Sequence, residues 1–342
     1  MPGLAAGNHK PALQARWADS FDDAVTDLVW SSDKGLVAAS ASGWIKRYTA
    51  DGAPVAQWQG HRGGVVCLRL QPEGELLASA GEDGKVKLWN QSGEVAEVLV
   101  EESGWIEHLE WTPDGRVLAA GAERTIHLWK GRESLGVWYD PRRRLLAMAW
   151  APDGKRLATA SNKGIYVWRL GGDAPVQLLE FPGAPLSVAW SRNGRALAVG
   201  TQDGFLQIWR REPNGKAKQL TMRGYLAKVV CLAWHPHTPL IASAGGKDVV
   251  LWNLIANSGA NRATPLKRHT RTITKLAYEA HGRLLASGDR EGRVCLWRDS
   301  GELEEEWLLG SEVTALQWCA EQATLAVGTS EGRVHVYAGA SR

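Results

Sequence analysis

Short stretches of alternating apolar and polar residues recur along the whole chain, and turn-forming residues follow each of them. Residues 65–70 and 86–89 show the alternation most clearly, and residues 76–80 form a nearly continuous run of small apolar side chains. Such runs, separated by Pro-Glu-Gly and Asp-Gly turn sequences, predict three β-strands. A weaker fourth strand is predicted over residues 94–100, before the pattern begins again.

The same group of strands repeats eight times, and an aromatic residue closes each third strand. These closing residues stand 39 to 45 positions apart, and they are Tyr48, Trp89, Trp129, Trp168, Trp209, Trp252, Trp297 and Tyr337. A repeat of about 40 residues with several short strands is typical of the blades of a β-propeller and not of a helical solenoid. We therefore predict an all-β, single-domain β-propeller.

The number of fourth strands decides how the ring closes. Eight three-strand groups are present, but only seven fourth strands follow them before the sequence ends. Residues 11–17 precede the first group just as residues 53–58 precede the second, so we predict eight four-stranded blades in which the N-terminal strand joins the C-terminal blade. A seven-bladed ring with one irregular unit is the alternative. The boundaries define a flexible N-terminus, the propeller and a C-terminal tail, at residues 1–10, 11–337 and 338–342.

Tryptophan is unusually frequent, with 18 Trp against 3 Phe, and most of it follows the repeat. Six Trp end third strands, and six end first strands: Trp30, Trp111, Trp150, Trp190, Trp234 and Trp318. Large flat side chains at these places would fill the wedge between blades, each contributing about 1.5 to 3 kcal/mol by burial. The other six are Trp17, Trp44, Trp58, Trp105, Trp138 and Trp307.

Composition limits the kinds of partner. The chain of 342 residues is 44% hydrophobic and 23% charged, as in ordinary globular proteins, and its net charge of +3 is too small to attract nucleic acid or an anionic membrane strongly. It contains no run of 18 apolar residues, so no membrane span is expected. Cys67, Cys231, Cys295 and Cys319 form no closely spaced pair, which fits buried thiols in a reduced, cytoplasmic compartment.

Motifs for catalysis or metal binding fail in their context. Residues 328–332 match the GxSxG pattern, but they lie in a predicted turn between strands, where the nucleophile elbow of a strand-to-helix turn cannot form. Walker, HExxH and Rossmann patterns are absent from the sequence, and we expect neither enzymatic activity nor a cofactor. His235 and His237 stand close together, but further ligands are missing nearby, so we expect a solvated loop without metal.

Unit two carries five residues that resemble the WD40 repeat family: Gly60, His61, Ser79, Asp83 and Trp89. That family has a glycine-histidine opening and a hydrogen-bonded tetrad of His, Ser, Asp and Trp, and the resemblance extends over residues 11–337. It implies that Asp83 orients His61 and that His61 reaches Ser79, which in turn accepts the indole N–H of Trp89.

Other units depart from the tetrad. Unit seven keeps His269, Ser287 and Trp297 but has Glu291 at the position of the aspartate, and unit six has Tyr225 in place of the histidine. We therefore expect most blades to be held by packing without a full tetrad. The content of Ala, Arg and Trp is also similar to that of bacterial cytoplasmic WD40 proteins.

Arginine and aromatic residues gather in the loops that would emerge on one face of the propeller, a combination typical of interaction hot spots. Trp105 is the strongest candidate, because its counterpart in unit two is Gly64 and no core position requires an indole there. The candidates for partner binding are Arg62, Trp105, Arg142, Arg143, Arg144, Arg271, Trp44 and Phe205.

The resemblance and these loops favour a non-catalytic scaffold that presents this face to a protein or peptide partner. The alternative is a phosphate-directed binder of nucleic acid or of a phosphorylated partner, acting through a cluster of Arg142, Arg143 and Arg144 with Arg62 and Arg271. The small net charge makes nucleic acid the less favoured partner. We further expect a cytoplasmic monomer without membrane contact.

Overall fold

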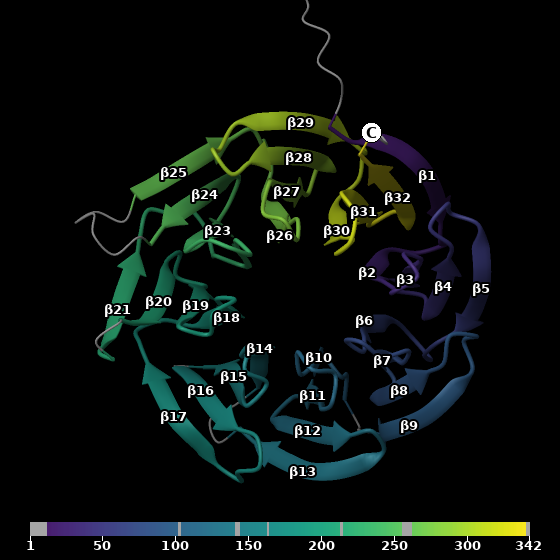
Figure 1. Ribbon diagram of the computed structural model, residues 1–342, viewed down its shortest axis with the longest axis horizontal. Coiled ribbons are helices and arrows are strands. Elements are labelled where there is room, and N and C mark those ends of the chain that lie inside the picture. Colours follow the sequence, from purple (N-terminus) through teal and green to yellow (C-terminus); the bar gives the residue numbers. More distant parts are fainter. Residues whose placement is uncertain are drawn as a thin grey trace, which may run out of the picture.

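The computed structural model describes residues 12–101, 104–140, 144–162, 164–212, 215–254 and 262–339. Its strands form eight four-stranded antiparallel sheets, which are arranged around one axis as the blades of a ring (Figure 1). No helix occurs in these residues, and so none of them forms a long apolar helix of the kind that crosses a membrane. The predicted eight-bladed propeller is confirmed, and the seven-bladed alternative is wrong.

Seven blades consist of four consecutive strands, ordered from the ring axis outward. Blades one and two contain β2 (Val25–Trp30), β3 (Leu36–Ser40), β4 (Trp44–Tyr48) and β5 (Pro54–Gln59), then β6 (Val65–Leu70), β7 (Leu77–Gly81), β8 (Lys85–Trp89) and β9 (Val95–Glu101). Blades three and four contain β10 (His108–Trp111), β11 (Leu118–Ala122), β12 (Thr125–Lys130) and β13 (Glu133–Tyr139), then β14 (Leu145–Trp150), β15 (Arg156–Ser161), β16 (Gly164–Arg169) and β17 (Pro175–Glu180).

The chain continues in the same order through the rest of the ring. Blades five and six contain β18 (Pro185–Trp190), β19 (Ala196–Thr201), β20 (Leu206–Arg211) and β21 (Ala217–Met222), then β22 (Cys231–Trp234), β23 (Leu240–Ala244), β24 (Asp248–Asn253) and β25 (Arg262–Lys267). Blade seven contains β26 (Ile273–Tyr278), β27 (Leu284–Asp289), β28 (Arg293–Arg298) and β29 (Leu303–Leu308). The last three strands are β30 (Val313–Trp318), β31 (Thr324–Thr329) and β32 (Arg333–Ala338).

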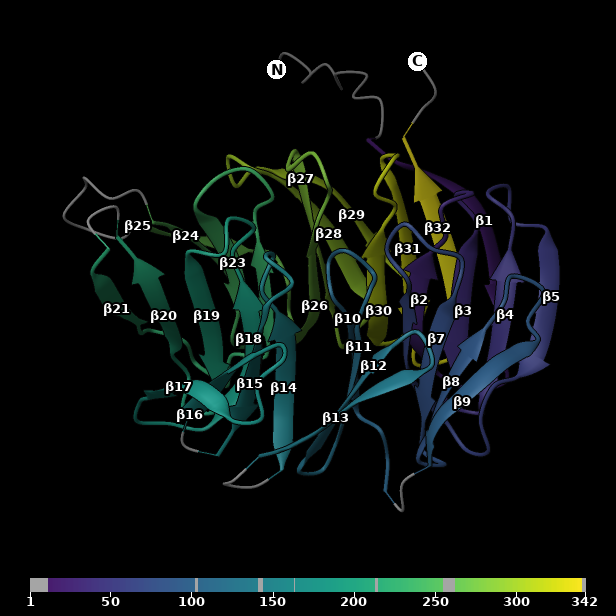
Figure 2. The ribbon, with the colours of Figure 1, turned by 60° about the horizontal axis from the view of Figure 1, so that its bottom comes forward.

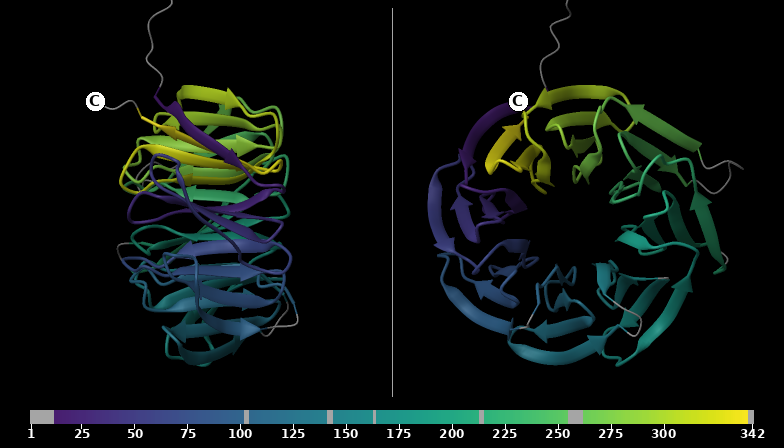
Figure 3. Two further views of the ribbon diagram at one scale, coloured as in Figure 1. Left: turned by 90° about the vertical axis from the view of Figure 1, so that its right-hand side faces the viewer. Right: turned by 180° about the vertical axis from the view of Figure 1, so that it is seen from behind.

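Blade eight is completed by the other end of the chain, as predicted. Strand β1 (Gln14–Ser20) pairs antiparallel with β32, from Gln14 opposite Ala338 to Ser20 opposite Arg333. Figure 3 shows this purple strand beside the yellow C-terminal strands. The strand lies three residues later than residues 11–17, because residues 18–20 continue the pairing. Residues 1–11 and 340–342 lie outside the described part of the chain, so most of the two predicted tails does too.

The six tryptophans that end inner strands connect neighbouring blades by hydrogen bonds as well as by packing. Each donates its indole N–H, over 3.0 to 3.3 Å, to a backbone carbonyl on the inner strand of the preceding blade. Trp30 donates in this way to Gln317, so the series crosses the junction between the first and last blades. A buried indole N–H needs such a partner, and these bonds fix how one blade is seated on the next.

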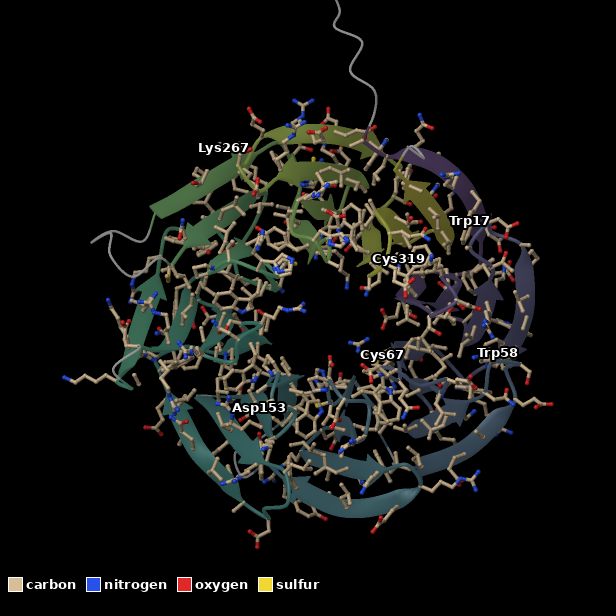
Figure 4. All side chains as sticks on the ribbon, in the orientation of Figure 1. Trp17, Trp58, Cys67, Asp153, Lys267 and Cys319 are labelled. Atoms are coloured by element: carbon tan, nitrogen blue, oxygen red, sulfur yellow. The ribbon has the colours of Figure 1, made fainter. Side chains whose placement is uncertain are left out.

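A second set of aromatic contacts links the blades farther from the axis. An outer-strand Trp packs on the closing aromatic of the next blade in four places, with ring centroids 4.7 to 5.7 Å apart, and the pairs are Trp17 with Tyr48, Trp58 with Trp89, Trp138 with Trp168 and Trp307 with Tyr337. Figure 4 places Trp17 and Trp58 toward the outside of the ring. Four of the six tryptophans that end neither an inner strand nor a third strand are therefore structural.

The cysteines belong to the packed interior. All four are buried and none forms a disulfide; in Figure 4, Cys67 and Cys319 lie on the inner side of the ring. Burial raises the pKa of the Cys67, Cys231 and Cys295 thiols to about 12, because the charged thiolate is disfavoured away from water. These thiols are poor nucleophiles at neutral pH.

Candidate functional site

The two rims of the ring, visible in Figure 2, carry different connections. We call one the loop face: it bears the loops from each outer strand to the next inner strand and the loops between second and third strands. Hydrogen bonds join the two kinds of loop, such as those from Gly60 N–H to Gly43 O at 2.8 Å and from Ile273 N–H to Gly246 O at 2.9 Å. The opposite rim, which bears the tight turns, is the turn face.

A hydrogen-bonded chain of four side chains supports the loop face in blade two. Nδ1 of His61 lies 2.7 Å from Asp83, Nε2 of His61 lies 2.7 Å from the Ser79 hydroxyl, and the Trp89 indole lies 2.8 Å from that hydroxyl. Asp83 also accepts the backbone N–H of Arg62 at 3.0 Å, so the chain fixes the start of the loop that carries Arg62. These are the contacts that the resemblance implied.

The order of hydrogen-bond donors and acceptors in this tetrad determines the protonation state of His61. Asp83 can only accept, so Nδ1 of His61 donates to it; Trp89 donates to Ser79, whose hydroxyl then donates to Nε2 of His61. A neutral imidazole satisfies every group in this sequence. Burial lowers the pKa of His61 in the same sense, against the opposing effect of Asp83.

Blade seven contains a second complete tetrad, and the carboxylate predicted for it was wrong. His269 contacts Ser287 at 2.7 Å, and Trp297 donates to Ser287 at 2.9 Å, but the carboxylate at Nδ1 of His269 is Asp289, at 2.8 Å. Glu291 lies on the surface and accepts from the Thr270 hydroxyl instead. Asp289 stands at the end of β27, where its short side chain reaches the imidazole directly.

Two further blades keep part of the arrangement. In blade six the Tyr225 hydroxyl lies 2.5 Å from Ser243 and accepts the Trp252 indole N–H at 2.6 Å, so a phenol replaces the imidazole. In blade four the Trp168 indole donates to the Thr159 hydroxyl at 2.9 Å. More blades therefore have a polar link beneath their loops than the sequence pattern indicated.

Two of the predicted aromatic candidates are exposed on the loop face. Trp105, just before β10, is 53% exposed, and Trp44, the first residue of β4, is 36% exposed. Trp105 makes no hydrogen bond or ring contact with the described residues, whereas the other large exposed apolar side chains lie mostly on outer strands. Arg62 and Arg271 are also exposed on this face, in the loops that enter blades two and seven.

Phe205 is not a surface residue, contrary to the prediction. It is 5% exposed and packs edge-on against Phe181, with ring centroids 6.3 Å apart. The Arg223 guanidinium lies over its ring at 5.6 Å. The loop before β18 supplies the apolar ring that Phe205 covers, so this phenylalanine closes the space between strands instead of facing a partner.

The predicted arginine cluster is not assembled in the described structure. Arg144 forms a two-pronged ion pair with Glu107, which neutralises its charge. Arg142 and Arg143 lie outside the described residues. Arg62 enters blade two and Arg271 enters blade seven, and blades one and eight stand between them (Figure 1). The geometry gives no support to a phosphate site made of these residues.

His235 is a structural residue and not part of a solvated loop. It is 6% exposed, its Nδ1 accepts the backbone N–H groups of His237 and Thr238, and its Nε2 donates to Gly282 O at 3.0 Å. Both ring nitrogens are thus occupied by the protein itself. Within the described residues, no group of three or more His, Cys, Asp or Glu side chains is arranged to hold a metal ion.

Charged groups other than the tetrads and the predicted arginine cluster also lie near the ring axis. Arg69 on β6 contacts Asp27 on β2 at 2.9 Å and Glu110 on β10 at 3.4 Å, so one guanidinium connects three blades. On the loop face, Lys228, Lys275 and Arg290 line a hollow of about 330 Å³ between blades six and eight. Lys275 stands on an inner strand, where an alternating pattern gives no sign that it faces a hollow.

Comparison with known proteins agrees with this architecture. The protein-family model described as "WD domain, G-beta repeat" matches six segments, residues 52–90, 94–130, 133–169, 175–210, 217–253 and 261–298, which together are more than half of the chain. Each match runs from one outer strand to the closing aromatic of the next blade. The sequence repeat is therefore offset from the blade by one strand, which is why an N-terminal strand is needed to close the ring.

Similar proteins share only part of their length with this chain. Telomerase protein component 1 of Rattus norvegicus is 24% identical over 81% of this chain and 11% of its own length. THO complex subunit 3 of Arabidopsis thaliana is 37% identical over 32% of this chain and 35% of its own. Cell division cycle 20.1, cofactor of APC complex, also from Arabidopsis thaliana, is 31% identical over 44% of this chain and 34% of its own.

A solved structure matches the whole ring. The crystal structure of the computationally designed Ika8 protein superposes with a TM-score of 0.80 and 22% identity, covering 94% of this chain and 98% of that one. At this identity the likeness concerns the fold alone. The family follows from the six matched repeats, which cover more than half of the chain, and the tetrads of blades two and seven agree with it: the chain belongs to the WD40 repeat family.

Proposed function

We propose that this protein is a non-catalytic scaffold that holds a protein or peptide partner across its loop face, with Trp105 as the main contact. The observation that carries the proposal is an indole that is 53% exposed and makes no hydrogen bond or ring contact with the described residues. Exposing a large aromatic ring to water is unfavourable, and Trp is the residue most enriched among interaction hot spots.

The surroundings of Trp105 support this reading. The exposed Trp44, at the start of β4 in blade one, and the exposed Arg62, in the loop that enters blade two, lie on the same face. Tryptophan and arginine side chains in one region make a typical interface centre. The underlying tetrad of blade two holds the backbone of the Arg62 loop in place, so part of the surface is ordered before a partner arrives.

Two similar proteins are named for assemblies: one is a subunit of the THO complex and the other a cofactor of the APC complex. We extend only the general role from them, a part in a protein assembly, and propose for this chain a cytoplasmic monomer that binds protein and neither nucleic acid nor membrane. Four buried, unpaired thiols and a net charge of +3 are consistent with that proposal.

Affinity purification from cells of the source species tests the proposal. Tagged wild type, Trp105→Ala and Leu135→Ala are compared, the last being a matched control because Leu135 is 42% exposed on an outer strand away from the loop face. Loss of a hot-spot Trp costs about 2 kcal/mol or more, or roughly thirtyfold in affinity. Partners that depend on Trp105 but not on Leu135 support the proposal; an identical partner list for all three proteins contradicts it.

A further inference from the structure

A groove on the turn face opens between blades five and six, far in the fold from Trp105. Its volume is about 600 Å³, which lies in the range of ligand-binding pockets. Blade five contributes the turn between β18 and β19 and the end of β20, and blade six contributes the turn between β22 and β23. Neither the resemblance nor the loop-face proposal assigns a role to this groove.

The groove carries an excess of positive charge. Arg192, Arg195 and Arg211 line it, are exposed, and form no ion pair with any described residue. The fourth arginine, Arg210, is bound by Glu212 and by a carbonyl of blade six, and Glu212 is the single carboxylate of the lining. Three guanidinium groups therefore face the groove without a counter-charge.

The turn of blade five is built in a way that preserves this charge. In blade three the turn has Asp114, which accepts from the Thr112 hydroxyl at 2.7 Å and from the Arg116 backbone N–H at 3.2 Å. Blade five has Asn193 at the same place, and its side-chain oxygen makes the same two bonds, to Ser191 at 2.9 Å and to the Arg195 N–H at 3.0 Å. The amide keeps the turn and removes the carboxylate that would neutralise the neighbouring arginines.

Blade four shows what a carboxylate does in this position. There Asp153 forms an ion pair with Arg156 at 2.8 Å, so the carboxylate neutralises the charge of the arginine in its own turn. Blades three and four also have proline, Pro113 and Pro152, where blade five has Arg192. Relative to the turn of blade three, blade five has lost one negative charge and gained one positive charge; relative to the turn of blade four, it has lost the negative charge.

The other side of the groove is apolar and rigid. Trp234, Pro236, Pro239 and Leu254 line it, and the buried His235 fixes the turn that carries the prolines. Proline and a fixed turn lose little conformational entropy when a ligand binds, so this wall is preorganised. A ligand that fits has anionic groups on one side and an apolar part on the other.

We propose that this groove binds an anionic segment of a protein partner, rich in acidic or phosphorylated residues and carrying an apolar side chain. Guanidinium groups recognise carboxylate and phosphate oxygens with paired, charge-assisted hydrogen bonds. A peptide is favoured over nucleic acid because the unpaired arginines are confined to one groove with an apolar wall and do not form the extended basic stripe that a nucleic-acid backbone requires.

Fluorescence anisotropy tests the proposal with labelled probes on the intact protein. The probes are an Asp/Glu-rich peptide containing one Leu, a phosphoserine peptide with its unphosphorylated counterpart, and a single-stranded oligonucleotide. Asn193→Asp is the most specific variant, because it supplies the carboxylate that the turns of blades three and four tolerate. Arg192→Gln with Arg195→Gln removes charge directly, and Arg116→Gln, in the equivalent turn of blade three, is the matched control.

We expect wild type to bind an anionic peptide with an affinity that falls as salt rises. The affinity should fall several-fold in Asn193→Asp and roughly tenfold or more in the double variant, and it should be unchanged in Arg116→Gln. All variants should melt as wild type does, and Trp105→Ala should bind these probes normally. The two peptides distinguish carboxylate from phosphate. The proposal is overturned if wild type binds neither peptide, if the groove variants bind as wild type does, or if the oligonucleotide binds more tightly through the same arginines.

Discussion

The contact of Trp17 with Tyr48 gives the sharpest test of how the ring is closed. Trp17 belongs to β1 in blade eight, while Tyr48 ends β4 in blade one, and their ring centroids lie 4.9 Å apart. Asp19 strengthens the same junction, because it accepts from the Tyr48 hydroxyl at 2.6 Å and from Lys46 at 3.2 Å. Trp17→Ala removes an indole that holds the first and last blades together.

The size of the effect follows from the buried area. A mostly buried aromatic side chain covers roughly 150 Å² of apolar surface, worth about 4 kcal/mol at about 25 cal/mol per Å². Gly52 packs directly on the indole, so the substitution leaves a cavity beside it, and we expect a loss of about 3 to 4 kcal/mol. With an unfolding entropy of about 0.7 kcal/mol per kelvin for 342 residues, the melting temperature should fall by about 4 to 6 °C.

Thermal unfolding followed by circular dichroism measures this shift, and the chain supplies a matched control. Trp105→Ala makes the same chemical change at a site that is 53% exposed and has no hydrogen bond or ring contact with the described residues, so its effect should stay within about 0.5 kcal/mol, or about 1 °C. If both variants melt at the same temperature as wild type, the N-terminal strand does not hold the ring in the way described.

Three further predictions concern the polar links. Asp289→Ala should lower the free energy of unfolding in urea by about 2 kcal/mol or more, because it leaves buried His269 without its acceptor. Glu291→Gln should change it by no more than about 0.5 kcal/mol. The reverse order would restore Glu291 as the tetrad carboxylate. Trp30→Phe keeps most of the packing but removes the N–H donated across the ring junction, and should cost about 1 to 2 kcal/mol by the same assay; a value near zero would show that the bond is not formed. Burial lowers the pKa of His61 and His269 in the folded protein, so below about pH 6.5 the unfolded chain binds more protons than the folded one. The free energy of unfolding should therefore fall from pH 7 to pH 5, by up to about 1.4 kcal/mol per pH unit for each proton that only the unfolded chain binds. A urea midpoint that stays constant over this range would contradict the prediction.

The fold could be predicted from the sequence because the local pattern of each unit predicts its own strands and turns. Turn residues such as Asp114 and Gly115 lie between alternating strands, and the pattern needs no information from distant parts of the chain. Ring closure followed from the missing fourth strand, since β1 supplies what blade eight lacks. Local patterns repeated eight times leave little freedom in the architecture.

The details of the site depend on contacts between units, which a pattern does not contain. Glu291 occupies the expected position of the tetrad carboxylate, but whether it or Asp289 reaches His269 depends on side-chain direction at the end of β27. Phe205 is buried because Phe181, from another loop, lies beside it.

Clusters of charged residues are also hard to predict from the sequence, because their members come from different units. Arg62 and Arg271 stand one and two residues after the tetrad histidines of their repeats, yet the ring places them in blades two and seven. Conversely, the sequence shows Arg192 and Arg195 only as two residues of a turn. The groove that they line forms only where blades five and six meet. Repeat position predicts the face on which a residue lies, but not its neighbours from other blades.

Hydrogen–deuterium exchange of the protein with and without its captured partner tests the central claim most directly, because it maps the contact surface on the unmodified chain. We predict slowed exchange in the loop-face segments around Trp44, Arg62 and Trp105, with little change on the outer strands. Protection confined to the outer strands or the turn face, with the Trp105 loop exchanging as in the free protein, would contradict it.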